Sequence, residues 1–78
     1  MMLNKIKTTK AYYEGYKIVV NGCQHFLAEF NHGIKAWDLF QLDEDGDIYG
    51  YKEWVNSFDR LKDAKSDLII GAVEYHAF

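Results

Sequence analysis

The stretch from Trp37 to Tyr51, WDLFQLDEDGDIYGY, places an acidic turn between two runs of apolar and aromatic residues. The Asp-Gly pair at 45–46 readily supplies the positive φ that a tight turn between twisted strands needs. The stretch therefore predicts a β-hairpin whose two strands lie at 34–42 and 48–51.

A second hairpin is predicted upstream of the first. Tyr16 to Val20, YKIVV, is rich in β-branched and aromatic residues and is typical of a strand. Asn21-Gly22 is a strong two-residue turn signal, and the residues from Cys23 to Phe30 alternate with a period of two. Together the two hairpins predict a four-stranded antiparallel meander.

The first ten residues, MMLNKIKTTK, show no clear period and carry three lysines. We expect residues 1–10 to form a flexible basic arm outside the sheet. Thr8 or Thr9 is suited to cap a short helical turn over residues 11–14, which Gly15 would end.

Downstream of the meander the period changes to three-and-four spacing, which indicates a helix. The helix could begin near Lys52, or Trp54 and Val55 could extend the fourth strand and Ser57 cap a helix that starts at Phe58. We favour the second alternative, with a helix from Ser57 to Ile70 that Gly71 ends. The positions expected to face the sheet are Phe58, Leu61, Ala64, Leu68 and Ile69. The predicted fold is α+β, a single domain over 1–78 in which one C-terminal helix covers a four-stranded antiparallel β-meander.

Composition limits the class of protein. With one cysteine among 78 residues, Cys23, the chain can form no internal disulfide, which fits a reducing compartment. No apolar run reaches the roughly 18 residues that a transmembrane helix needs, and the N-terminal segment is too polar for a signal peptide. We therefore expect a cytoplasmic protein without membrane association.

Charge and aromatic content point to a protein partner. Thirteen of the 78 residues are aromatic, more than a thin core can easily hide. Residues 1–35 carry a net charge of +3 and residues 36–78 a net charge of −6. An acidic half does not bind phosphate backbones, which need clustered lysine and arginine. A basic surface on another protein is the expected partner.

Candidate sites for chemistry are weak. Asp43, Asp45 and Asp47 alternate like calcium ligands, but the glycine and the final glutamate of an EF-hand loop have no counterpart at the required spacing. Cys23 and His25 share a strand face without the further ligands that zinc needs, or the third group that a thiol nucleophile needs. We expect no catalytic residue, metal site or cofactor.

The candidate partner-binding surface consists of aromatic and acidic residues around the predicted acidic turn. They are Trp37, Asp43, Glu44, Asp45, Asp47, Tyr49, Tyr51 and Trp54. Two other hypotheses remain open: a cation or small ligand bound by Asp43, Asp45 and Asp47, and nucleic acid bound by Lys5, Lys7 and Lys10, although the overall charge disfavours the latter. A homodimer that buries an open sheet face or edge is a further expectation.

Four segments carry a resemblance to known proteins: YKIVVNG at 16–22, WDLF at 37–40, DEDGD at 43–47 and SFDRLKDAK at 57–65. Their arrangement resembles the short accessory proteins of bacteriophages and other mobile elements, of which anti-CRISPR proteins are one example. The resemblance implies a protein that binds and inhibits a host protein. It implies no catalytic residues.

Overall fold

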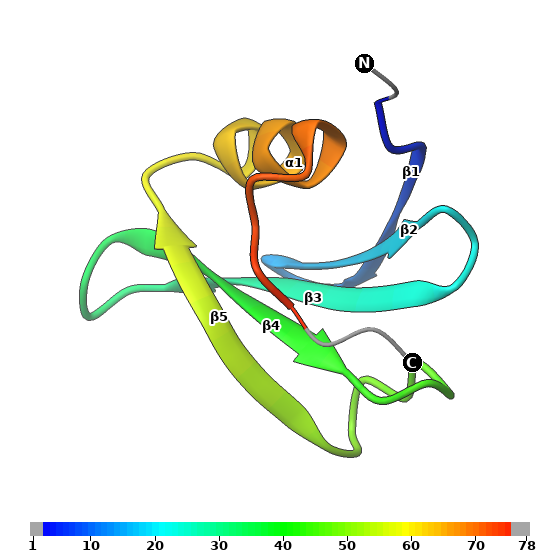
Figure 1. The fold of residues 1–78 in the computed structure, drawn as a ribbon. Helices are drawn as coiled ribbons and strands as arrows, with labels where there is room; N and C mark the ends of the chain where they lie inside the picture. Colours follow the sequence, from blue (N-terminus) through cyan, green and yellow to red (C-terminus); the bar gives the residue numbers. More distant parts are fainter. Residues whose placement is uncertain (1–2, 76–78) are drawn as a thin grey trace.

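The computed structural model describes residues 3–75 and has an α+β fold. A curved antiparallel sheet has the strand order β1-β2-β3-β4-β5, and one helix lies across one of its faces (Figure 1). The predicted C-terminal helix and antiparallel meander are confirmed, but the sheet has five strands where four were predicted. The elements are β1 (Ile6–Tyr12), β2 (Gly15–Val20), β3 (Gln24–Asn31), β4 (Ala36–Leu42), β5 (Lys52–Phe58) and α1 (Leu61–Ile70).

Strand β1 is the additional strand, and it replaces the predicted basic arm and helical turn. Its residues pair with β2 in antiparallel register, with Ile6 opposite Val20 and Lys7 opposite Val19. The polar run Lys7-Thr8-Thr9-Lys10 suits an edge strand, and Ile6 is the β1 residue that packs against the core. The prediction of a flexible arm is therefore wrong from Ile6 onward.

The hairpin predicted at 16–30 is confirmed. Asn21 and Gly22 take the left-handed conformation, with φ of 53° and 74°, in the turn between β2 and β3. Ile18 pairs with Phe26 across the hairpin. Both side chains are fully buried beneath the helix.

The connection from β4 to β5 differs from the prediction. Residues 43–51 form a loop, so the strand predicted at 48–51 is wrong, and β5 begins at Lys52. Trp54 and Val55 belong to β5, which agrees with the alternative that extended the fourth strand. The pairing of β4 with β5 shifts register between Leu39 and Phe40, which bulges β5 around Val55.

Helix α1 begins at Leu61, later than either predicted start. Ser57 does not cap it, because Ser57 lies in β5 and its hydroxyl donates to Asp38 Oδ1 at 2.6 Å. The end of the helix is as predicted, since Gly71 takes a left-handed φ of 74° and its N–H bonds to the carbonyl of Asp67.

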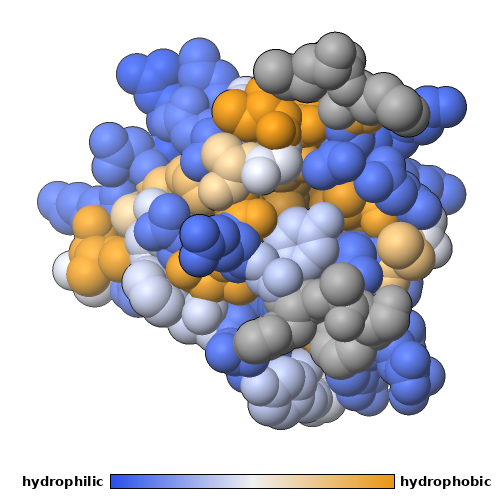
Figure 2. All heavy atoms as spheres, viewed as in Figure 1, coloured by the Kyte–Doolittle hydropathy of each residue, from blue (hydrophilic) through white to orange (hydrophobic). Residues whose placement is uncertain are grey.

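The hydrophobic core lies between α1 and the sheet. Leu68 and Ala64 are the fully buried helix residues, and Leu61 and Phe58 pack against the core from partly buried positions. Figure 2 shows hydrophobic atoms gathered in the middle of this view, with hydrophilic residues around them. The buried core cluster comprises Ile18, Val20, Phe26, Ala28, Leu39, Leu68 and Val73. The opposite sheet face, called the open face below, is not covered by α1.

Candidate functional site

The acidic loop at 43–51 is organised by its own carboxylates. Asp43 Oδ1 accepts hydrogen bonds from the backbone N–H groups of Asp45 and Gly46, each at 3.1 Å, and Asp47 Oδ1 accepts one from Tyr49 N at 2.9 Å. Such bonds from an aspartate to the backbone two or three residues on are typical turn chemistry. Asp43 and Asp47 therefore fix the loop, whereas Glu44 and Asp45 extend into solvent.

The loop folds back onto the open face of the sheet. Gly46 is buried, with φ of 70°, and a Cβ atom placed on it would lie 2.5 Å from His25 Nδ1 and 2.8 Å from Lys17 Nζ. Glycine at position 46 is thus needed both for the backbone conformation and for the close approach. His25 Nδ1 is buried there and has no hydrogen-bond partner among residues 3–75.

Three of the four predicted aromatic residues are exposed. Tyr49 is 84% exposed, Tyr51 is 59% exposed and Trp54 is 56% exposed. The indole N–H of Trp54 donates to Ser57 Oγ at 3.1 Å, and the Tyr51 hydroxyl donates to Glu53 Oε2 at 2.9 Å. These rings are held in place by polar contacts while most of their surface stays in water.

Trp37 does not join this group. It lies on the side of the sheet that α1 covers and packs against the core from a partly buried position. Its ring sits between Tyr16 and Phe30, with centroid separations of 5.8 and 5.4 Å. Trp37 therefore contributes to packing and is not an exposed anchor.

A short network of hydrogen bonds orients the indole of Trp54. Ser57 accepts from the indole and donates to Asp38, and Asn31 Nδ2 donates to the other Asp38 oxygen at 3.0 Å. Burial alone would raise the pKa of Asp38, but the hydrogen bonds that it accepts outweigh burial and hold the pKa below its ordinary value of 3.8. Asp38 is therefore charged at neutral pH and orients the network.

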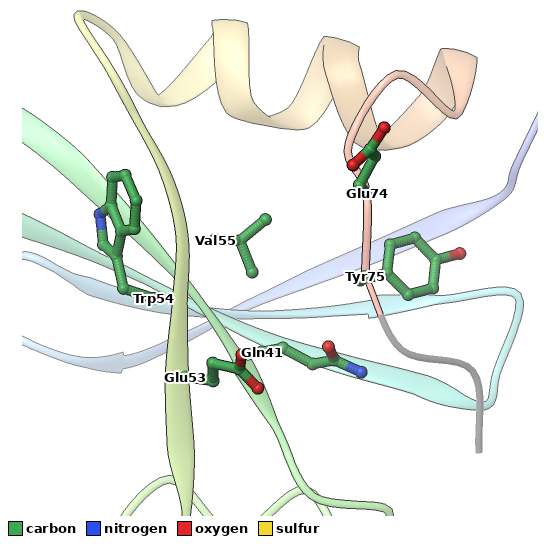
Figure 3. Close-up of a pocket in the computed structure, with 6 residues that line it drawn as sticks. All are labelled: Gln41, Glu53, Trp54, Val55, Glu74 and Tyr75. Carbon is green, nitrogen blue, oxygen red and sulfur yellow. The ribbon is translucent and has the colours of Figure 1, made fainter.

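A hollow of about 400 Å³ lies on the other side of β5. Figure 3 shows that Glu53 and Val55 point to one side of the strand and Trp54 to the other, while Glu74 and Tyr75 come from the segment after α1. Tyr75 packs edge-on against Phe26, with ring centroids 5.0 Å apart. The hollow is bordered by the carboxylates of Glu53 and Glu74.

Metal chemistry finds no support in the part of the chain that the structure describes. Residues 3–75 contain no group of three histidine, cysteine or acidic residues placed to hold a metal ion. Cys23 is exposed in the turn before β3. Within the same residues, no helix has the length and apolar character needed to cross a bilayer.

The two oppositely charged halves of the sequence form different parts of the fold. Because strand order follows sequence order, the positive half of the chain forms β1 to β3 and the negative half forms β4, the acidic loop, β5 and α1. Sequence reasoning did not identify Lys17 as a neighbour of the N-terminal lysines. The pairing of Thr9 with Lys17 and of Lys7 with Val19 brings these side chains to one face.

Comparison of the chain with protein-family models, with curated proteins and with solved structures gives no match in any of the three.

Proposed function

We propose that the protein is a non-catalytic interaction module that binds a protein partner through its aromatic–acidic surface. This surface is defined as Tyr49, Tyr51 and Trp54 together with Asp43, Glu44, Asp45 and Asp47. The observation that carries the proposal is the exposure of three large aromatic side chains, Tyr49 and Tyr51 within the acidic loop and Trp54 in the strand that follows it. Tyrosine and tryptophan are enriched at protein interfaces, where one part of the ring is buried and the polar atom keeps a partner.

Trp54 is the proposed anchor of the interface. Its indole is oriented through Ser57 and Asp38 before any partner arrives. A side chain that is already ordered loses less conformational freedom on binding, and more of its contact energy then appears as affinity. Truncation of such an anchor typically costs about 2 kcal/mol or more in binding free energy.

The carboxylates give the surface its preference for a basic partner. Glu44 and Asp45 are exposed at the tip of the loop, and Asp47 is exposed beside Tyr49. Charges at the rim of an interface act mainly on the association rate and on its salt dependence. The resemblance to phage accessory proteins supports inhibition of a host protein as the consequence of binding.

The experiment is affinity capture from a host lysate, followed by binding kinetics with the purified partner. Trp54→Ala is compared with Tyr13→Ala, which removes another exposed ring (82% exposed) at the β1–β2 turn, far along the chain from the acidic loop. We expect Trp54→Ala to speed dissociation by a factor of about 30, which corresponds to 2 kcal/mol, and Tyr13→Ala to have no effect.

Charge reversal tests the second half of the proposal. Glu44→Lys with Asp45→Lys should slow association and weaken its salt dependence, whereas Asp59→Lys with Asp63→Lys makes the same change of net charge near the start of α1. Capture of the partner by folded Trp54→Ala and by the loop variant at wild-type rates would show that the interface lies elsewhere.

A further inference from the structure

Among residues 3–75, strand β1 pairs with β2 alone and so forms an edge of the sheet. Asn21 N donates to the carbonyl of Lys5 at 2.7 Å, which fixes the phase of the β1–β2 ladder. Hydrogen-bonded and non-bonded pairs alternate in an antiparallel ladder. Lys7 and Thr9 therefore bond to β2, and the backbone groups of Ile6, Thr8 and Lys10 point away from the sheet.

A groove lies over β1 and β2 on the open face, next to this edge. Two adjoining hollows, of about 420 and 520 Å³, share Lys7 and Val19 and together extend along β1 from Lys5 to Ala11. Tyr49 and Ile48 of the acidic loop form part of the wall of the larger one. The groove thus has an apolar floor and is as long as an extended segment of several residues.

Lysines border the groove along its length. Lys7 comes from β1, and Lys5 directly precedes the strand and lies two residues before Lys7. Lys17 comes from β2, and Lys10 lies near the end of β1. Side chains two residues apart in a strand are separated by about 6.8 Å, which is also the spacing of alternate side chains in a neighbouring strand. Lys5 and Lys7 therefore match acidic side chains at alternate positions of an extended peptide, and Lys17 adds positive charge behind them.

We propose that the β1 edge and its lysine groove bind an extended acidic segment of a partner protein, which adds to the sheet as a sixth strand. The outward backbone groups of Ile6, Thr8 and Lys10 supply main-chain hydrogen bonds, as in other cases of strand addition. The groove lysines supply the preference for alternating carboxylates. The groove adjoins the aromatic–acidic surface at Asp47 and Tyr49, but its lysines give it the opposite sign of charge, and the inference does not depend on the proposed function.

The charges select this occupant over two others. A second copy that paired β1 with β1 would bring the lysines of both copies together, which is unfavourable. Single-stranded nucleic acid needs a series of aromatic stacking platforms. Within the described part of the chain, Tyr49 is the one aromatic side chain that lines the groove, and Asp47 adds a negative charge there.

The direct test uses a fluorescein-labelled peptide of alternating glutamate and valine, with an alternating lysine–valine peptide and a labelled oligothymidylate as comparisons. We expect anisotropy to report binding of the acidic peptide alone. Amide hydrogen exchange measured by NMR should show new protection at Ile6, Thr8 and Lys10, and no new protection at Lys7 and Thr9, whose amides already bond to β2.

Two variants separate the backbone contribution from that of charge. Thr8→Pro removes one outward N–H while leaving the β1–β2 ladder intact, because proline is tolerated where an edge-strand N–H faces solvent; Thr8→Val keeps the amide and is its control. Lys7→Glu with Lys17→Glu is compared with Lys35→Glu and Lys62→Glu, two exposed residues outside the groove. We expect Thr8→Pro and the groove pair each to weaken binding about tenfold or more, and both controls to bind like the wild type.

Each remaining outcome contradicts the proposal. Equal binding of the acidic peptide by wild type and the folded groove variant would rule out recognition by these lysines. If the groove variant binds the acidic peptide more weakly but Thr8→Pro does not, the peptide is held by electrostatic attraction and does not add to the sheet as a strand. Binding of the oligothymidylate in place of the peptide would assign the groove to nucleic acid.

Discussion

The hydroxyl of Tyr12 donates a hydrogen bond to Glu29 Oε2, so β1 is joined to β3 across the intervening strand. The ring crosses above Gly15, where a Cβ atom would lie 2.4 Å from Tyr12 Cε2. Burial, together with the hydrogen bond to the Glu29 carboxylate, raises the pKa of Tyr12 well above its usual range. The edge strand is thereby linked to the middle of the sheet by a side chain as well as by its ladder.

Tyr12→Phe should destabilise the protein, because Glu29 then loses a donor in a partly buried position. We expect the free energy of unfolding to fall by roughly 1–3 kcal/mol, the usual range for a hydrogen bond to a charged group. Urea unfolding at neutral pH measures the change. Tyr13→Phe, at the exposed neighbouring position, is the control, and equal midpoints for the two variants would show that the Tyr12 bond contributes nothing.

Gly46→Ala should be more destabilising than Gly22→Ala. Both glycines have a left-handed φ, of 70° and 74°, and share the backbone penalty of about 1–2 kcal/mol for an L-residue. A Cβ at position 46 also meets His25, whereas nothing lies within 4 Å of one at position 22. The difference between the two losses of unfolding free energy measures the contact of the loop with the sheet. Equal losses in the two variants would mean that the loop moves away from His25 at no cost.

Leu68→Ala should largely unfold the protein. Leu68 is a fully buried residue of α1. Its truncation should cost about 2–5 kcal/mol of the roughly 5–15 kcal/mol that stabilise a typical domain. Leu61 is only partly buried, so Leu61→Ala should cost less. Thermal unfolding followed by circular dichroism ranks the two, with exposed Lys62→Ala as the reference. A larger loss of stability for Leu61→Ala than for Leu68→Ala would mean that the first turn of α1 contributes more to the core than its last turn.

Stability should fall in acid through Asp38. Its pKa is lower in the folded protein than in the unfolded chain, so its contribution is complete above about pH 4 and is lost as pH decreases through the folded-state value. Unfolding by urea between about pH 5 and pH 2 should therefore show a pH dependence that Asp38→Asn reduces. Asp59→Asn, at an exposed position beyond β5, should keep the wild-type profile. Superimposable curves for wild type and Asp38→Asn would contradict this role.

Local signals in the sequence were sufficient for the hairpin at 16–30 and for the end of α1. Asn21-Gly22 and Gly71 each adopt the positive φ that their residue types favour. In these places turn chemistry and periodicity act over a few residues, and the rest of the chain does not alter the outcome.

Other elements depended on contacts that the sequence does not display. Strand β1 has little apolar character, and its partner β2 supplies the pairing that makes it a strand. Ser57 has the composition of a helix cap, but the neighbouring strand offers its hydroxyl the Asp38 carboxylate. Trp37 looks equivalent to Trp54 in composition, and only the sheet register places one beneath the helix and the other in solvent.

The meander order also has a kinetic consequence. Each strand pairs with the strand next to it in sequence, so the sheet can form hairpin by hairpin, with short loops to close. The side-chain amide of Asn4, by contrast, donates to the carbonyl of Leu68 across 64 residues, and Asn4 N donates to the carbonyl of Ile69 at 2.8 Å. Docking of the helix therefore follows formation of the sheet and waits for the synthesis of residues 61–70, so a ribosome-bound chain would hold a formed sheet before its core is sealed.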